Sequence, residues 1–136
     1  MERKIRKRLF VSCAIIERSG LVLAARRSPA MAQPDKWEFP GGKLKPGETP
    51  AASLIREIQE ELAVTIEVTE ALPPSDYDYP AFALTLYPFT ATIRCGEPKA
   101  LEHSELIWLP PAELPRLDWA PADLPVLASY LAVRVK

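Results

Sequence analysis

Apolar runs and turn-forming segments alternate along the first quarter of the chain. Residues 9–16 form a β-branched, apolar run, and residues 21–25 form a second run after the turn-forming segment 17–20. Two apolar runs joined by a short turn predict a β-hairpin. Residues 28–36, which contain two prolines, are predicted to form a loop.

Three later runs have the composition of strands. They cover residues 64–68, 81–93 and 105–109. The stretch 73–80, rich in proline and tyrosine, separates the first two runs and is expected to be a connection.

Residues 50–62 are predicted to form a helix. Thr49 suits the N-cap, and Pro50 suits the first helical position because its missing N–H costs nothing there. At 100° per residue, five apolar residues share one arc that can pack on a sheet. They are Ala51, Leu54, Ile55, Ile58 and Leu62.

A second helix is predicted over residues 121–133, with an apolar stripe of its own. The stripe consists of Leu124, Val126, Leu127, Tyr130 and Leu131. The chain shows no repeat, linker or low-complexity tract, so residues 1–136 are expected to form one domain, a sheet covered by two helices.

Composition narrows the classes of function. The chain is 48% hydrophobic and 26% charged, and no apolar run approaches the ~20 residues of a membrane span. A net charge of −1 argues against binding duplex nucleic acid, and the basic residues 3–8 are expected to be a solvated terminus. The apolar stretch after them is broken by Glu17 and Arg18, so it is a poor secretory signal and a cytoplasmic location is expected. Cys13 and Cys95 are expected to be reduced, packed thiols.

Glu57, Glu60 and Glu61 form an acidic cluster on one arc of the first predicted helix. Like charges at this spacing repel one another, and two of them lie unfavourably at the helix C-terminus. A bound Mg²⁺ or Mn²⁺ would remove the conflict, because both ions prefer carboxylate oxygens. The alternative is a solvated acidic face. The loop before the helix favours a site, since Gly41 and Gly42 allow an exposed backbone whose carbonyl can ligate metal.

This segment resembles the Nudix hydrolase signature, G-x5-E-x7-R-E-U-x-E-E-x-G-U, in which U is a bulky aliphatic residue. The matching positions are Gly42, Glu48, Arg56, Glu57, Ile58, Glu60, Glu61 and Val64. Ala63 departs from the pattern, because the family has glycine there. An alanine would cost about 1 kcal/mol if the helix C-cap needs a left-handed conformation.

Segments outside the signature resemble the MutT-type branch of the family, which includes 8-oxo-dGTP diphosphatases and CTP pyrophosphohydrolases. These segments are residues 25–27, 37–43 and 119–126. The resemblance implies an α+β fold, an α/β/α sandwich with a mixed β-sheet. It also implies Mg²⁺-dependent hydrolysis of a nucleoside triphosphate at the β-phosphorus, which yields a nucleoside monophosphate and pyrophosphate.

The resemblance also implies roles for particular residues. The implied metal ligands are the Gly41 carbonyl, Glu57, Glu60, Glu61 and Glu102. Arg56 would orient the acidic cluster by ion pairing, and Glu57 or Glu102 would accept the proton of the attacking water. Glu102 is equally compatible with an ordinary exposed loop acid.

Four residues are implied or suggested as substrate contacts. Asp123 corresponds to the position that reads the nucleobase edge, and an ionised Asp would favour an edge rich in N–H donors, such as that of cytosine. Phe39 and Trp37 could provide a stacking wall, and Arg26 could contact the base or a phosphate. Simple core packing is an equal alternative for Phe39.

Trp119 and Tyr130 are assigned to the core. His103, the only histidine, is expected to be a surface loop residue, with action as a general base as the alternative. Two other functions stay open: a Nudix hydrolase of ADP-ribose or a dinucleotide, and a non-catalytic nucleotide-binding Nudix domain. The expected oligomeric state is a monomer or a homodimer.

Overall fold

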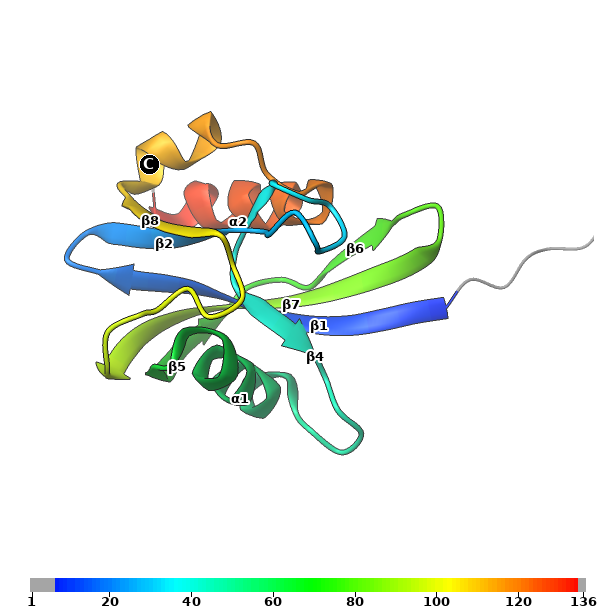
Figure 1. Cartoon of the computed structure of the whole chain (residues 1–136), viewed down its shortest axis with the longest axis horizontal. Helices are drawn as coiled ribbons and strands as arrows, with labels where there is room; N and C mark the ends of the chain where they lie inside the picture. Colours follow the sequence, from blue (N-terminus) through cyan, green and yellow to red (C-terminus); the bar gives the residue numbers. More distant parts are fainter. Residues whose placement is uncertain (1–6, 135–136) are drawn as a thin grey trace, which may run out of the picture.

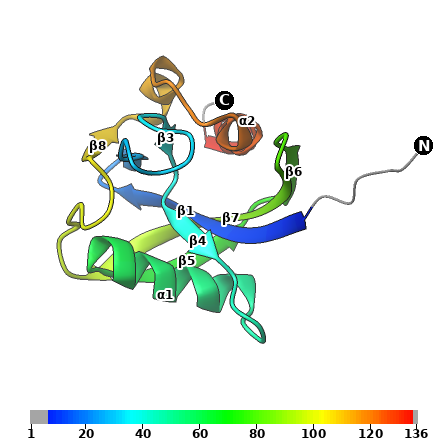
Figure 2. The same ribbon diagram turned by 45° about the vertical axis from the view of Figure 1, so that its right-hand side comes forward.

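The structure is a computed structural model and describes residues 7–134. A curved sheet lies between two helices, with α1 on one face and α2 on the other (Figure 1). A second view separates the same three layers (Figure 2). The predicted α+β fold, an α/β/α sandwich with a mixed sheet, is confirmed.

The longest strands form the centre of the sheet. Strand β1 (Lys7–Arg18) runs parallel to β7 (Phe82–Cys95) over ten residue pairs. Strands β5 (Thr65–Ala71) and β6 (Ser75–Asp78) both run antiparallel to β7. One parallel pairing among antiparallel ones makes the sheet mixed.

The other strands bring the middle of the chain to β1. Strand β2 (Leu21–Arg26) forms the predicted hairpin with the end of β1, and β3 (Trp37–Glu38) and β8 (Glu105–Leu109) lie on either side of β2. Strand β4 (Gly41–Lys43) pairs with the middle of β1. The glycine pair is therefore held against the centre of the sheet.

Helix α1 (Pro50–Leu62) has the predicted bounds. The Thr49 hydroxyl accepts a hydrogen bond from the Ala52 N–H at 3.1 Å, which is the expected N-cap. Ile55 is wrongly placed in the buried arc, because it is 40% exposed at the margin of that arc. Glu61 takes a buried position instead.

Ala63 ends the helix in the left-handed conformation, with φ 60° and ψ 32°. Its N–H donates to the Gln59 carbonyl at 3.1 Å. The C-cap that the family pattern fills with glycine is thus formed by alanine.

Helix α2 (Leu124–Arg134) follows two short 3-10 helices, η1 (Pro111–Arg116) and η2 (Pro121–Asp123). It begins three residues later than predicted, and Leu124 at its start is 51% exposed rather than part of the buried stripe. Trp119 and Tyr130 lie in the core between α2 and the sheet, as predicted.

Two further predictions are wrong. The stretch 73–80 is not only a connection, because it contains β6. Aspartate and tyrosine alternate over residues 76–79, and the two tyrosines, Tyr77 and Tyr79, pack in the core between α2 and the sheet. Cys13 is buried, but Cys95 is exposed at the end of β7. Both thiols are free, and no helix within residues 7–134 is long and apolar enough to cross a membrane.

Candidate active site

The glycine pair lets α1 approach the sheet closely. A Cβ on Gly42 would lie 2.2 Å from the carboxylate carbon of Glu57, and one on Gly41 would lie 1.9 Å from the Ser12 carbonyl oxygen. Both distances are far below van der Waals contact. A side chain at position 41 would clash with the backbone of β1, and one at position 42 would displace the Glu57 carboxylate. The first carboxylate of the acidic cluster therefore rests directly on β4.

Arg56 holds three carboxylates at once. Its Nε and Nη2 donate to the two oxygens of Glu48 at 2.7 and 2.9 Å, a bidentate pair. Its Nη1 donates to Glu57 at 2.9 Å and to Glu60 at 3.2 Å. Hydrogen bonds from Arg56 and from the Lys45 backbone lower the pKa of Glu48 to about 2. Arg56 thereby offsets the repulsion within the cluster.

Glu61 lies apart from this network. The residue is 8% exposed, and its Oε1 has no hydrogen-bond partner among the described residues. Burial raises its pKa to about 9, and the charges of Glu38, Glu102 and Glu57 act in the same direction, while a hydrogen bond from the Gly41 backbone opposes them. A buried carboxylate oxygen without a partner, beside three other acids, fits a cation ligand.

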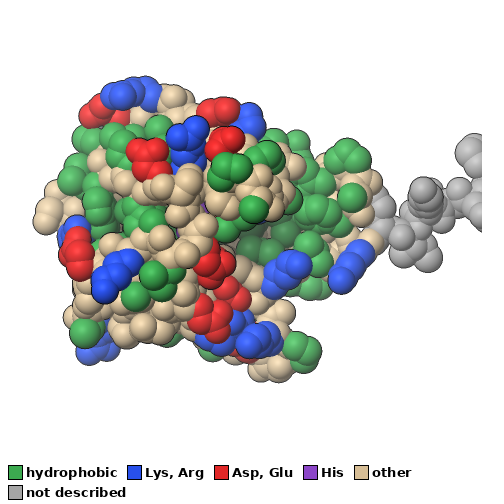
Figure 3. Space-filling view, in the orientation of Figure 1, with side chains coloured by type: hydrophobic (Ala, Val, Ile, Leu, Met, Phe, Trp, Pro, Cys, Tyr) green, Lys and Arg blue, Asp and Glu red, His purple; other side chains and the backbone are tan. Residues whose placement is uncertain are grey.

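The predicted metal ligands lie near one another, but their side chains are not arranged around a common point where a metal ion could bind. Within residues 7–134 no group of three or more His, Cys, Asp or Glu side chains is arranged to hold a metal ion. Glu57 and Glu60 face Arg56, and Glu102 is an exposed loop residue whose charge acts on Glu61. On the face shown in Figure 3, acidic side chains gather with Lys and Arg side chains directly beside them.

A cavity of about 220 Å³ extends from the glycine pair to the start of α2. Apolar side chains of β1 and β7 line it, together with aromatic residues and a few polar groups. Its lining includes Leu9, Val11, Leu84, Leu86, Phe39, Tyr79, Phe82, Gly41, Gly42, Arg27, Glu38 and Asp123. A mostly apolar pocket with few polar groups suits a small organic ligand.

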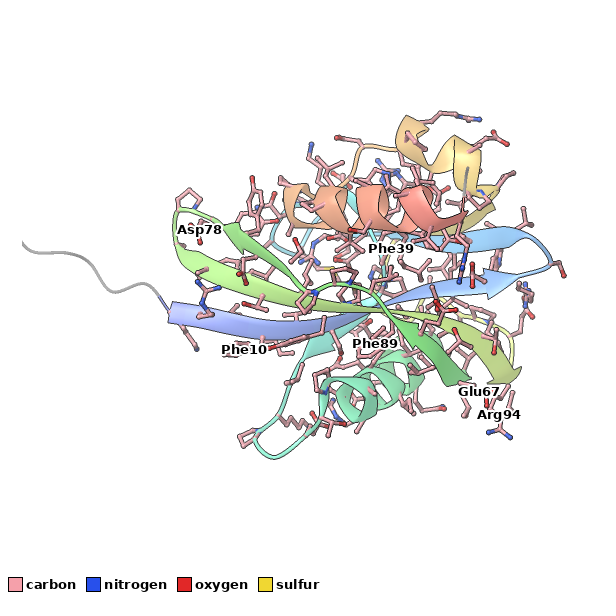
Figure 4. The ribbon with its side chains drawn as sticks, turned by 180° about the vertical axis from the view of Figure 1, so that it is seen from behind. Phe10, Phe39, Glu67, Asp78, Phe89 and Arg94 are labelled. Atoms are coloured by element: carbon pink, nitrogen blue, oxygen red, sulfur yellow. The ribbon has the colours of Figure 1, made fainter. Side chains whose placement is uncertain are left out.

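Asp123 lies at the η2 end of this cavity. It is buried, and its Oδ2 accepts a hydrogen bond from the Phe39 N–H at 2.8 Å. Burial, followed by the charge of Glu38, raises its pKa well above the usual range. The Phe39 ring lies 4.7 Å from the Trp119 ring, and Figure 4 shows Phe39 between α2 and the sheet. Phe39 therefore combines both sequence interpretations: it lines the cavity and packs in the core.

Trp37 and Arg26 do not line the cavity. Trp37 is partly buried against the α2-side core. Arg26 lies 3.6 Å from Glu105 and donates to the Asp35 carbonyl at 3.3 Å. Its neighbour Arg27 lines the cavity instead. Successive residues of an extended chain point to opposite sides, so an error of one position moves the side chain out of the cavity.

Sequence reasoning missed Glu38 and misplaced His103. The His103 side chain is 0% exposed, and its Nε2 lies 2.7 Å from Glu38 Oε2. The other Glu38 oxygen accepts from Arg27 Nη1 at 2.6 Å. Glu38 lies in β3, which has only two residues, Trp37 and Glu38. So short a strand shows no alternating pattern from which the sequence could predict that Glu38 points inward.

Comparison with known proteins identifies the family of the chain. The NUDIX domain family matches residues 6–130, so the chain belongs to the Nudix hydrolase family. It is 35% identical to the CTP pyrophosphohydrolase of Escherichia coli K12, over 94% of this chain and 95% of that protein. It is also 32% identical to the 8-oxo-dGTP diphosphatase of the same strain, over 90% of this chain and 95% of that protein.

A solved structure gives the same result for the fold. The solution structure of the Escherichia coli ORF135 protein matches with a TM-score of 0.82 and 34% identity, covering 96% of this chain and 93% of that one. Nudix hydrolases generally use divalent metal ions.

Proposed function

We propose that the protein is a Mg²⁺-dependent nucleoside triphosphate pyrophosphohydrolase that acts on cytidine-type or oxidised nucleotides. The observation that carries this proposal is the cavity itself. It has a buried carboxyl at one end, Asp123, and the glycine pair beneath the acidic cluster at the other. A nucleotide bound with its base near Asp123 would direct its phosphates toward Gly41 and Gly42.

The donor set at the phosphate end fits a divalent cation. Glu57, Glu60 and Glu61 with the Gly41 carbonyl would hold it, and the unpartnered Oε1 of Glu61 is the best evidence among them. A bound Mg²⁺ or Mn²⁺ supplies charge neutralisation at phosphate oxygens and a lowered pKa for water. Glu61 would give up its proton on binding the cation, since the raised pKa reflects burial and neighbouring acids.

The chain's own residues would then serve hydrolysis in distinct ways. Arg56 keeps Glu48, Glu57 and Glu60 in place through five hydrogen bonds of 3.2 Å or less. Glu57 or Glu102 would accept the proton of the attacking water. The products would be a nucleoside monophosphate and pyrophosphate.

Asp123 would read the nucleobase. One of its oxygens is occupied by the Phe39 N–H. Burial raises the pKa of this carboxyl and so favours its protonated form, which can donate as well as accept a hydrogen bond. Both the amino edge of cytosine and the edge of an oxidised purine are compatible with such a group. The names of the two relatives, one a CTP pyrophosphohydrolase and one an 8-oxo-dGTP diphosphatase, support the same range.

The proposal is tested by hydrolysis of a nucleotide panel with Mg²⁺. The panel contains CTP, dCTP, 5-methyl-dCTP, 8-oxo-dGTP, dATP and ADP-ribose, and each product is identified. We expect monophosphate and pyrophosphate from a cytidine or oxidised nucleotide. Preferred cleavage of ADP-ribose would favour the other Nudix activity, and no cleavage of any compound would favour a binding domain.

Glu60→Gln and Glu61→Gln are expected to lower turnover at least about a hundredfold each. The matched control is Glu67→Gln. Glu67 is an exposed acid of β5, labelled in Figure 4 near the end of the sheet, and its variant should keep the activity of the wild type. Equal turnover in all three variants would contradict the assignment of the acidic cluster.

A further inference from the structure

We propose that His103 is a positioning residue that holds the loop between β7 and β8 so that Glu102 faces Glu61. This inference rests on the proposed function, because it assigns Glu102 a place in the same hydrolytic site. It concerns a histidine that sequence reasoning placed on the surface and that the structure buries completely.

The loop is attached to the body of the protein on both sides of Glu102. The Leu101 N–H donates to the Glu61 carbonyl at 3.3 Å, and the Ser104 N–H donates to the Arg26 carbonyl at 3.0 Å. The first contact ties the loop to the end of α1, and the second ties it to the end of β2. The backbone of Glu102 therefore runs between the end of α1, which carries the acidic cluster, and the end of β2.

The side chain of His103 attaches this loop to Glu38, a residue that lines the cavity. Its Nε2 lies 2.7 Å from Glu38 Oε2. Arg27 holds the other oxygen of Glu38 at 2.6 Å, so the carboxylate has one defined orientation. Both Arg27 and Glu38 line the cavity. A single buried contact thus connects the loop that carries Glu102 to the cavity wall.

Stability alone does not account for a histidine at this position. Its Nδ1 is buried and has no partner among the described residues. A buried polar atom without a hydrogen bond is unfavourable, and an apolar side chain would avoid that penalty. What the histidine adds is a fixed position for the loop. The Leu101 N–H already bonds to the Glu61 carbonyl, so anchoring His103 to Glu38 holds Glu102, which lies between Leu101 and His103, beside the end of α1 that carries Glu61.

The test compares three substitutions at this residue. His103→Leu removes the contact with Glu38. His103→Gln keeps it, because the amide nitrogen of Gln can occupy the place of Nε2. We expect His103→Leu to lower kcat on the best nucleotide about 10-fold to 100-fold with little change in KM, and His103→Gln to restore most of the loss. If His103→Leu does not fold, His103→Asn replaces it, because the shorter amide does not reach Glu38.

A double-mutant cycle identifies the group through which His103 acts. If His103 works by placing Glu102, then His103→Leu should add little to the loss caused by Glu102→Gln. Mn²⁺ binding, measured calorimetrically without substrate, should weaken by a similar factor in the two single variants. Tyr130→Phe is the control for general destabilisation, because Tyr130 bonds Glu17 at the opposite end of the sheet, and it should change neither kcat nor Mn²⁺ binding.

The outcomes separate the two proposals. A wild-type protein that hydrolyses no nucleotide refutes the proposed function. An active wild type, with kcat and Mn²⁺ binding unchanged in His103→Leu, overturns the role of His103. Additive losses in the cycle overturn it as well, since they would mean that His103 acts independently of Glu102.

Discussion

Replacing Glu61 with glutamine should stabilise the metal-free protein, although it lowers turnover. Glu61 is buried beside other acids, and its pKa of about 9 in the folded state compares with an ordinary value of 4.5. Between these two values the folded protein keeps a proton that the unfolded chain releases. The stabilisation that the wild type gains from protonated Glu61 is therefore fully present below pH 4.5 and is lost as the pH rises toward 9.

The size of the effect follows from the same two values. Each pH unit in this interval costs about 1.4 kcal/mol of unfolding free energy. Between the ordinary value of 4.5 and pH 7 the cost reaches about 3 kcal/mol. Glutamine has nearly the shape of a protonated glutamate and does not titrate. Glu61→Gln should therefore exceed the wild type by about 3 kcal/mol at pH 7 and by little at pH 4.5.

The assay is urea unfolding of both proteins in the presence of a chelator, at pH values from 5 to 8. The difference in unfolding free energy should grow by about 1.4 kcal/mol per pH unit. Added Mg²⁺ should raise the stability of the wild type and have a smaller effect on the variant, because only the wild type offers the Glu61 carboxylate. A wild type as stable as Glu61→Gln at pH 8, or a difference that does not depend on pH, would refute the reasoning.

Three further substitutions have defined outcomes. Gly42→Ala should lower kcat at least about tenfold in steady-state assays, because its Cβ would lie 2.2 Å from the carboxylate of Glu57; wild-type kcat would contradict this. Ala63→Gly should raise the unfolding free energy by about 1 kcal/mol in urea without altering turnover, because the position is left-handed; an unchanged or lower stability would contradict it. Asp123→Asn keeps an acceptor for the Phe39 N–H and adds a fixed donor, so the kcat/KM ratio of 8-oxo-dGTP to dCTP should rise about tenfold. An unchanged ratio would remove Asp123 from base recognition.

The features that sequence predicted well depend on local interactions. Helix α1 has the predicted bounds because its N-cap and first-turn proline act within one turn. The hairpin and β8 follow from apolar runs closed by turn residues. Each of these signals lies within a few residues of the element that it defines.

The features that the sequence did not predict depend on contacts between side chains that are far apart in the sequence. His103 is buried because Glu38, 65 residues away, binds its ring. Arg27 rather than Arg26 lines the cavity because the register of β2 decides which side chain points inward. Ile55 is exposed because the buried arc of α1 is shifted toward Ser53 and Glu61, on the side away from Ile55. No local pattern reports these choices.

The spacing of the family signature can be explained through contacts in this chain. Glu48 directly precedes the N-cap of α1 and accepts two hydrogen bonds from Arg56, and Gly42 leaves room for the carboxylate of Glu57. These positions determine where charges lie, so substitutions there should alter activity. Ala63 is different: it adopts the left-handed C-cap without glycine, and its N–H donates to the Gln59 carbonyl. The glycine of the signature therefore allows the left-handed conformation at the helix end without strain. Alanine at this position lowers the stability of the fold but leaves the acidic cluster unchanged.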